Sequence, residues 1–75
     1  MADREGLSVG DAVHLTAQPS YLKTADPMPM LRPGDLVAID EVAQVVGLRS
    51  GSQVAVRFRR GTFLLDASQL RRIEP

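Results

Sequence analysis

Four prolines between residues 17 and 35 restrict this chain more than any other feature of its sequence. They stand at positions 19, 27, 29 and 33, and Gly34 follows the last of them. Each proline lacks a backbone N–H group and holds the residue before it in an extended conformation. Residues 17–35 therefore fit neither the helix pattern nor the strand pattern. We expect a long ordered loop, because the segment is too rich in Met, Leu and Tyr for a disordered one.

The rest of the chain shows the two-residue periodicity of β-strands. In the clearest case, from Gln53 to Arg59, large apolar residues alternate with polar or small ones. Arg60-Gly61 then predicts a tight connection into the strand that begins at Thr62, since glycine tolerates positive φ. Asp66 to Gln69 has the form of a capping box and predicts a single helical turn. Further strands are predicted over residues 12–16, 42–48 and 71–74, and residues 36–39 form a short apolar run that Asp40-Glu41 closes.

This order of elements indicates an all-β fold with about five short strands. A strand, a long first loop at residues 17–35, three hairpin-linked strands, one short 3-10 turn and a last strand follow one another. That is the order of a small SH3-like antiparallel barrel, which removes sheet edges by closure. We expect a frayed N-terminus at residues 1–8 and a single domain over residues 9–75. The predicted core consists of Val13, Leu15, Val37, Ile39, Val45, Val54, Val56, Phe58, Phe63, Leu65, Leu70 and Ile73.

Composition argues against catalysis. The 75 residues include no Cys and a single His, and the glycines do not follow a phosphate-loop spacing. A deep ligand cleft would also use most of the interior of so small a domain. We therefore expect no enzyme, no cofactor, no metal and no small-molecule substrate. The polar start and the lack of a long apolar run predict a cytoplasmic monomer without direct membrane insertion.

The segment from Tyr21 to Pro33 is the first candidate for a binding surface. In a polyproline II conformation Met28 and Met30 would lie on different edges, and two of the three edges would be apolar. Two interpretations remain open. The methionines could plug the mouth of the barrel, or an outward edge could contact a partner with little loss of entropy, because proline stiffens the loop.

Arginines form the second candidate. Residues 1–45 carry three basic and seven acidic groups, a net charge of −4, whereas residues 46–75 carry six and two, a net charge of +4. Alternation places Arg57 and Arg59 on the outer face, and Arg60 follows in the turn. Such a face could be merely solvated, or could bind an acidic protein or a nucleic acid. The overall neutral charge and the few aromatic residues make nucleic acid the weakest of these interpretations.

The block Lys23-Thr-Ala-Asp-Pro-Met-Pro-Met-Leu-Arg-Pro33 resembles the signature of the NblS-interacting protein A (SipA) family, small regulatory proteins of the cyanobacterial and plastid lineage. Gly10 to Val13, Val56-Arg57-Phe58 and Gly61 to Asp66 also match in order. The chain departs from the family pattern at Val54, often an aromatic there, and at Ala43, often a glycine. The resemblance implies an SH3-like barrel without enzyme activity.

It also implies a partner. Members of that family bind the catalytic, ATP-binding region of an NblS-type sensor histidine kinase and modulate its autophosphorylation in high-light and nutrient stress, and the response regulator can join the assembly. We therefore predict a histidine-kinase adaptor. The alternatives are a ferredoxin-docking subunit of a photosynthetic electron-transfer complex and an RNA-binding domain. The predicted partner-binding residues are Tyr21, Lys23, Thr24, Asp26, Met28, Met30, Arg32, Arg57, Arg59 and Arg60.

Overall fold

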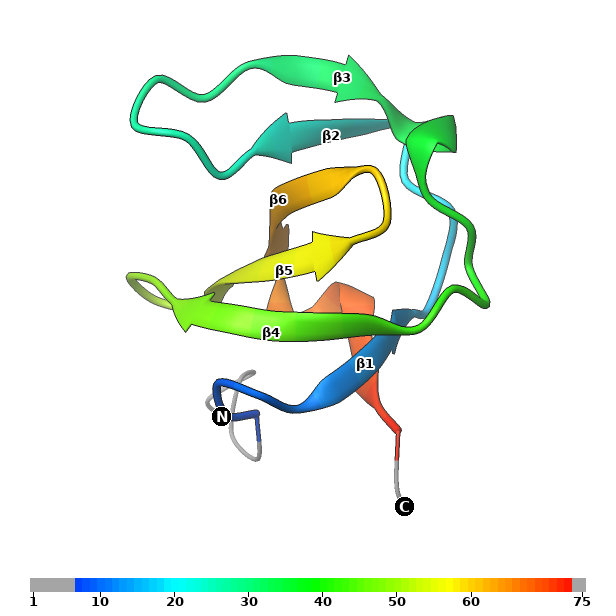
Figure 1. Cartoon of the computed structure of the whole chain (residues 1–75), viewed down its shortest axis with the longest axis vertical. Coiled ribbons are helices and arrows are strands. Elements are labelled where there is room, and N and C mark those ends of the chain that lie inside the picture. Colours follow the sequence, from blue (N-terminus) through cyan, green and yellow to red (C-terminus); the bar gives the residue numbers. More distant parts are fainter. Residues whose placement is uncertain (1–6, 74–75) are drawn as a thin grey trace.

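The computed structural model of the chain describes residues 7–73, which form one curved antiparallel sheet with two single-turn 3-10 helices (Figure 1). The strands follow the order β3-β2-β6-β5-β4-β1-β7 across the sheet. The elements are β1 (Ala12–Leu15), β2 (Tyr21–Thr24), β3 (Leu31–Pro33), η1 (Gly34–Leu36), β4 (Ala43–Leu48), β5 (Gln53–Phe58), β6 (Gly61–Asp66), η2 (Ala67–Gln69) and β7 (Leu70–Arg72).

The all-β antiparallel class is confirmed, as is the 3-10 turn before the last strand. The sheet is not closed, however, because β3 and β7 each have one neighbour and lie at its two edges. Among the described residues there are seven strands rather than about five. Most of the predicted frayed terminus, residues 1–8, lies outside the described residues, and Ser8 accepts a hydrogen bond from the Asp11 amide in a turn.

Residues 21–33 form a hairpin, whereas the sequence predicted one long loop over residues 17–35. The prolines do not prevent this, since Pro27 and Pro29 fall in the connection between β2 and β3. Pro33 lies in an edge strand, where a missing donor is tolerated. The Thr24 amide donates to the Met30 carbonyl at 2.9 Å, and the Met30 amide donates to the Thr24 hydroxyl at 2.8 Å.

The short apolar run at residues 36–39 does not form a strand. The 3-10 turn η1 ends at Leu36, and the Glu41 amide then donates to the Ala38 carbonyl in a second turn. Both turns bend the chain over a few residues, so the short apolar run cannot extend along a neighbouring strand. The capping box is confirmed: Asp66 accepts from the Ser68 amide, and Gln69 accepts from the Asp66 amide.

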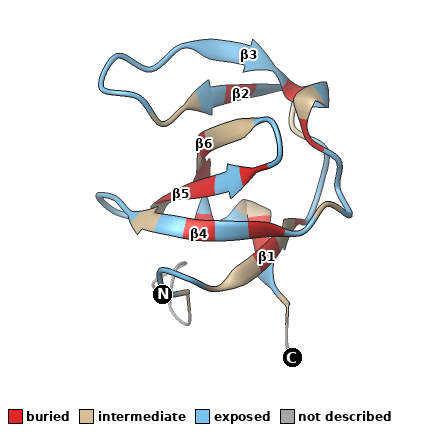
Figure 2. Cartoon of the chain, viewed as in Figure 1, coloured by how far each residue is buried: buried red, intermediate tan, exposed pale blue. Residues whose placement is uncertain are grey.

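Every strand except β3 contributes residues to one buried hydrophobic core. Figure 2 shows buried segments in red on β1, β4 and β5. Ten of the twelve predicted core residues are buried, but Ile39 is 44% exposed and Ile73 is intermediate. Ile39 is exposed because it lies in the turn between Ala38 and Glu41, and Ile73 is only partly buried because it follows the end of β7. The structure adds four buried hydrophobic residues that the pattern did not assign: Leu22, Ala43, Ala55 and Ala67.

Candidate partner-binding surface

The β2–β3 hairpin divides the residues predicted in the proline-rich segment between the two faces of the sheet. Leu22 is buried and is paired in register with Arg32, so these two side chains lie on the core side. Tyr21 and Lys23 alternate with Leu22 and therefore lie on the opposite face, where both are exposed. The sequence treated these residues as one surface, whereas the strand pleat separates them into two.

Both methionines of the hairpin lie in solvent. The exposed fractions are 84% for Met28 and 60% for Met30, and the adjacent Leu31 is 67% exposed. The hairpin is anchored instead through Leu22, which is 1% exposed and packs in the core. The interpretation that these methionines plug the mouth of a barrel is therefore wrong. The other interpretation, an outward apolar edge that is free to contact a partner, is consistent with their exposure.

The three arginines around the β5–β6 turn are positioned by strand register and by one acidic residue. Arg57 lies opposite Gln44 and donates to its Oε1 at 3.1 Å. The Arg59 amide donates at 2.8 Å to Oε2 of Glu41. Gly61 has a φ of 147°, a conformation that favours glycine, and it pairs with Phe58 across the turn that holds Arg59 and Arg60.

Arg32 extends this arginine group into a row. Three adjoining hollows are each lined by two of these arginines. Arg57 and Arg59 line a hollow of about 350 Å³, and Arg59 and Arg60 line one of about 250 Å³. Arg60 and Arg32 line the third, of about 280 Å³. We call Arg57, Arg59, Arg60 and Arg32 the arginine row. Thr24 and Asp26 line its last hollow. Sequence reasoning named every member of the row, but nothing in the sequence indicated that Arg32 and Arg60 meet.

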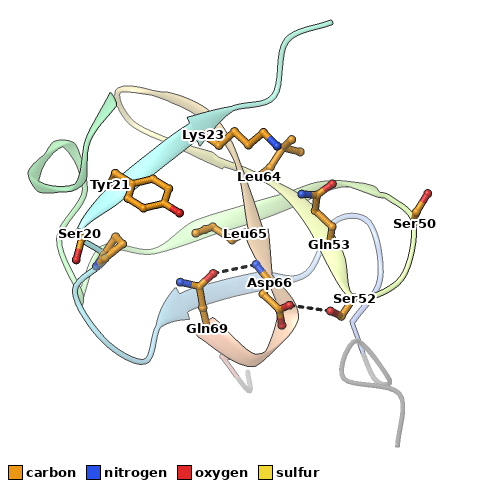
Figure 3. Close-up of a pocket in the computed structure, with 11 residues that line it drawn as sticks. Ser20, Tyr21, Lys23, Ser50, Ser52, Gln53, Leu64, Leu65, Asp66 and Gln69 are labelled. Atoms are coloured by element: carbon orange, nitrogen blue, oxygen red, sulfur yellow. Dashed lines mark hydrogen bonds between the residues drawn. The ribbon is translucent and has the colours of Figure 1, made fainter. Parts of the chain in front are cut away.

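A separate groove of about 540 Å³ lies beside β2, β6 and the β4–β5 turn (Figure 3). Tyr21 and Lys23 line it together with Gln53 and Leu64, which the sequence analysis did not single out. Asp66 lies at its lower end in the view and accepts from the Ser52 hydroxyl at 2.8 Å. The hydrogen bonds from the Ser68 amide and from Ser52 lower the pKa of the Asp66 carboxyl below its ordinary value of 3.8.

The predicted site is thus distributed over three places. Tyr21 and Lys23 line the groove, Met28 and Met30 form the exposed hairpin tip, and the remaining predicted residues line the hollows of the arginine row. Within residues 7–73, no group of three or more His, Cys, Asp or Glu residues could hold a metal ion. Over the same residues, no helix has the length and apolar character needed to span a membrane.

Comparison with known proteins gives one clear relationship. The family model of Protein CHLORORESPIRATORY REDUCTION 42-like, or CRR42-like, matches residues 9–70. The Arabidopsis thaliana protein named Protein CHLORORESPIRATORY REDUCTION 42, chloroplastic, is 35% identical over 69 residues. The alignment covers 91% of this chain, which spans only 57% of the length of the Arabidopsis protein. No solved structure is significantly similar to the chain.

These matches correct the sequence-based identification. The resemblance to the SipA family is wrong, because the match over almost the whole chain is to the CRR42-like model. The resemblance was the basis for three further predictions, which are therefore also wrong: the NblS-type histidine kinase as partner, its response regulator, and the role in a two-component system. The cytoplasmic location is contradicted as well, since the Arabidopsis relative is a chloroplastic protein. The eleven-residue proline block is therefore not diagnostic of a kinase regulator. The chain belongs to the CRR42-like family.

Proposed function

We propose that this protein is a non-catalytic docking module of a photosynthetic electron-transfer complex that serves chlororespiratory reduction. The name of the Arabidopsis relative supports the process. The arginine row supports the mode of action, because its four cations line three adjoining hollows of a small domain. The row is the observation that carries the proposal. Its partner is an acidic protein, and ferredoxin, the acidic carrier of photosynthetic electrons, is the first candidate.

Two features favour a protein partner over a nucleic acid. Asp26, Asp35 and Glu41 line the same hollows as the arginines, and carboxylates repel a continuous phosphate backbone. Next to the row, the hairpin tip exposes Met28 and Met30, and flexible thioether side chains adapt to apolar protein surfaces. A partner that presents carboxylates beside an apolar patch would complement both features.

The non-catalytic part of the proposal is supported by the sequence. A single histidine and no cysteine leave few candidates for nucleophilic or general-base chemistry. The histidine, His14, is half-buried in β1, and its Nδ1 lies 3.0 Å from the Leu15 carbonyl oxygen of the neighbouring residue. We assign the protein a binding role accordingly.

The proposal is tested by affinity capture from detergent-solubilised photosynthetic membranes with the tagged protein. We expect the wild-type chain to retain subunits of one electron-transfer complex and to release them as salt rises, because exposed charges are screened. Arg57→Glu with Arg59→Glu should abolish retention. Arg59→Glu alone is compared with Arg71→Glu, which makes the same charge change on β7.

Equal retention by Arg59→Glu and Arg71→Glu would remove the arginine row from the proposal. Failure of the wild-type chain to retain any subunit of an electron-transfer complex would overturn the proposed function itself. Binding of purified ferredoxin, measured by calorimetry at low salt, identifies the acidic partner. Retention of the complex without ferredoxin binding would assign the row to a subunit of the complex.

A further inference from the structure

We infer that Arg32 and Arg60 form a clamp for a single carboxylate of the acidic partner, an inference that rests on the proposed function. The two residues belong to different parts of the chain. Arg32 lies at the centre of β3, and Arg60 lies in the turn between β5 and β6. They line one hollow of about 280 Å³ together with residues of the β2–β3 hairpin and of the β5–β6 turn. Figure 1 shows that turn on the same side of the view as η1.

Both guanidinium groups are available for a ligand. Arg32 and Arg60 are exposed, and neither guanidinium group makes a hydrogen bond or an ion pair with any residue between 7 and 73. Arg57, by contrast, already donates to Gln44. A guanidinium carries five N–H donors in a planar fork that fits a carboxylate. Two such forks at one hollow can approach both oxygens of the same carboxylate from different sides.

The lining of the hollow suits a side chain that ends in a charge. The half-buried Leu36 contributes apolar surface, and the half-buried Thr24 and Thr62 line the hollow as well. The methylene groups of a glutamate can rest on the apolar part while its carboxylate meets the arginines. The hollow is small for a larger ligand, since drug-sized ligands occupy about 300–1,000 Å³.

The charge of the hollow selects a singly charged ligand. Asp26 lines it together with Arg32 and Arg60, so the two arginines and one aspartate leave a net charge of one positive unit. A carboxylate matches that charge. A phosphate monoester carries about −1.5 to −2 charges near neutral pH, which exceeds the single net positive charge of the hollow. The clamp is therefore assigned to a protein carboxylate rather than to a phosphate.

The experiment uses a blocked hexaglutamate peptide as the probe and follows the arginine Nε–Hε signals of the full chain by NMR. Hexaglutamine and inorganic phosphate are titrated in parallel. We expect the Arg32 and Arg60 signals to shift together with one dissociation constant. Arg32→Gln should weaken the peptide affinity reported by Arg60 by about two- to five-fold, the range for exposed ion pairs. Arg71→Gln, on the opposite edge strand, should leave it unchanged.

Three results would overturn the clamp. The first is that Arg32→Gln leaves the hexaglutamate affinity reported by the Arg60 signal unchanged. The second is that the Arg71 signal shifts with the same dissociation constant. The third is that phosphate binds Arg32 and Arg60 more tightly than the peptide does. Thermal unfolding of each variant confirms that the domain is intact. If the protein captures an electron-transfer complex from membranes but does not bind hexaglutamate, the clamp alone is rejected. If it binds hexaglutamate but captures no complex, the proposed function alone is rejected.

Discussion

Replacement of Gly34 by alanine tests how the β2–β3 hairpin is joined to the rest of the domain. Gly34 begins η1, directly after β3. A Cβ atom built at this position would overlap the Pro19 carbonyl oxygen and would lie 2.8 Å from the Pro19 carbonyl carbon and 2.9 Å from the Ser20 carbonyl carbon. These are backbone atoms of the loop before β2, so no side-chain rotation can relieve the overlap.

The expected cost follows from that rigidity. Forcing an extra methyl group into a packed region costs about 1–3 kcal/mol, and occasionally more when the backbone must move. Movement here would also strain the hydrogen bonds that Gln18 Nε2 donates to the Gly34 carbonyl at 2.7 Å and to the Val37 carbonyl at 3.0 Å. We therefore expect Gly34→Ala to lower the free energy of unfolding by about 3 kcal/mol. The total for 75 residues is only about 4–11 kcal/mol.

Urea unfolding followed by circular dichroism measures this difference, with Gly47→Ala as the control. A Cβ at Gly47 would lie 3.6 Å from the Ala55 Cβ, an ordinary contact, so that variant should stay within about 0.5 kcal/mol of the wild type. If Gly34→Ala unfolded as late as Gly47→Ala, the contact between the hairpin and the Pro19–Ser20 loop would not be rigid. The argument for the position of Arg32 would then weaken too.

Phe58→Ala should cost about 3–5 kcal/mol, because Phe58 is 4% exposed and its ring lies 6.2 Å from that of Phe63; an unchanged thermal midpoint would contradict its place in the core. Asp66 has a lowered pKa, so its charged form contributes stability above its unfolded pKa and loses it as pH falls through the folded pKa. The thermal midpoint of wild type should thus fall relative to Asp66→Asn on acidification, and parallel pH profiles would disprove this. Met28→Ala with Met30→Ala should leave the midpoint within a few degrees, since both are exposed, yet weaken capture of the complex; a large loss of stability would place them in the core.

The sequence by itself determined the features that depend on neighbouring residues. Alternation from Gln53 to Arg59 located β5 and its buried face, since a strand places successive side chains on opposite sides. Gly61 located the tight turn, because it adopts a φ that favours glycine. The capping box at Asp66 located η2, since its hydrogen bonds join residues at most three apart.

Only the tertiary structure decided the arrangement of the candidate site. The prolines could not show that β2 and β3 pair, because the hairpin depends on Leu22 reaching the core and on β2 joining β6. No local pattern could place Arg32 beside Arg60 or assign Tyr21 and Lys23 to the other face. The open edges of the sheet are likewise a result of strand order. Strand pairing and side-chain packing join residues far apart in the chain, and their energies depend on three-dimensional proximity that no short sequence pattern encodes.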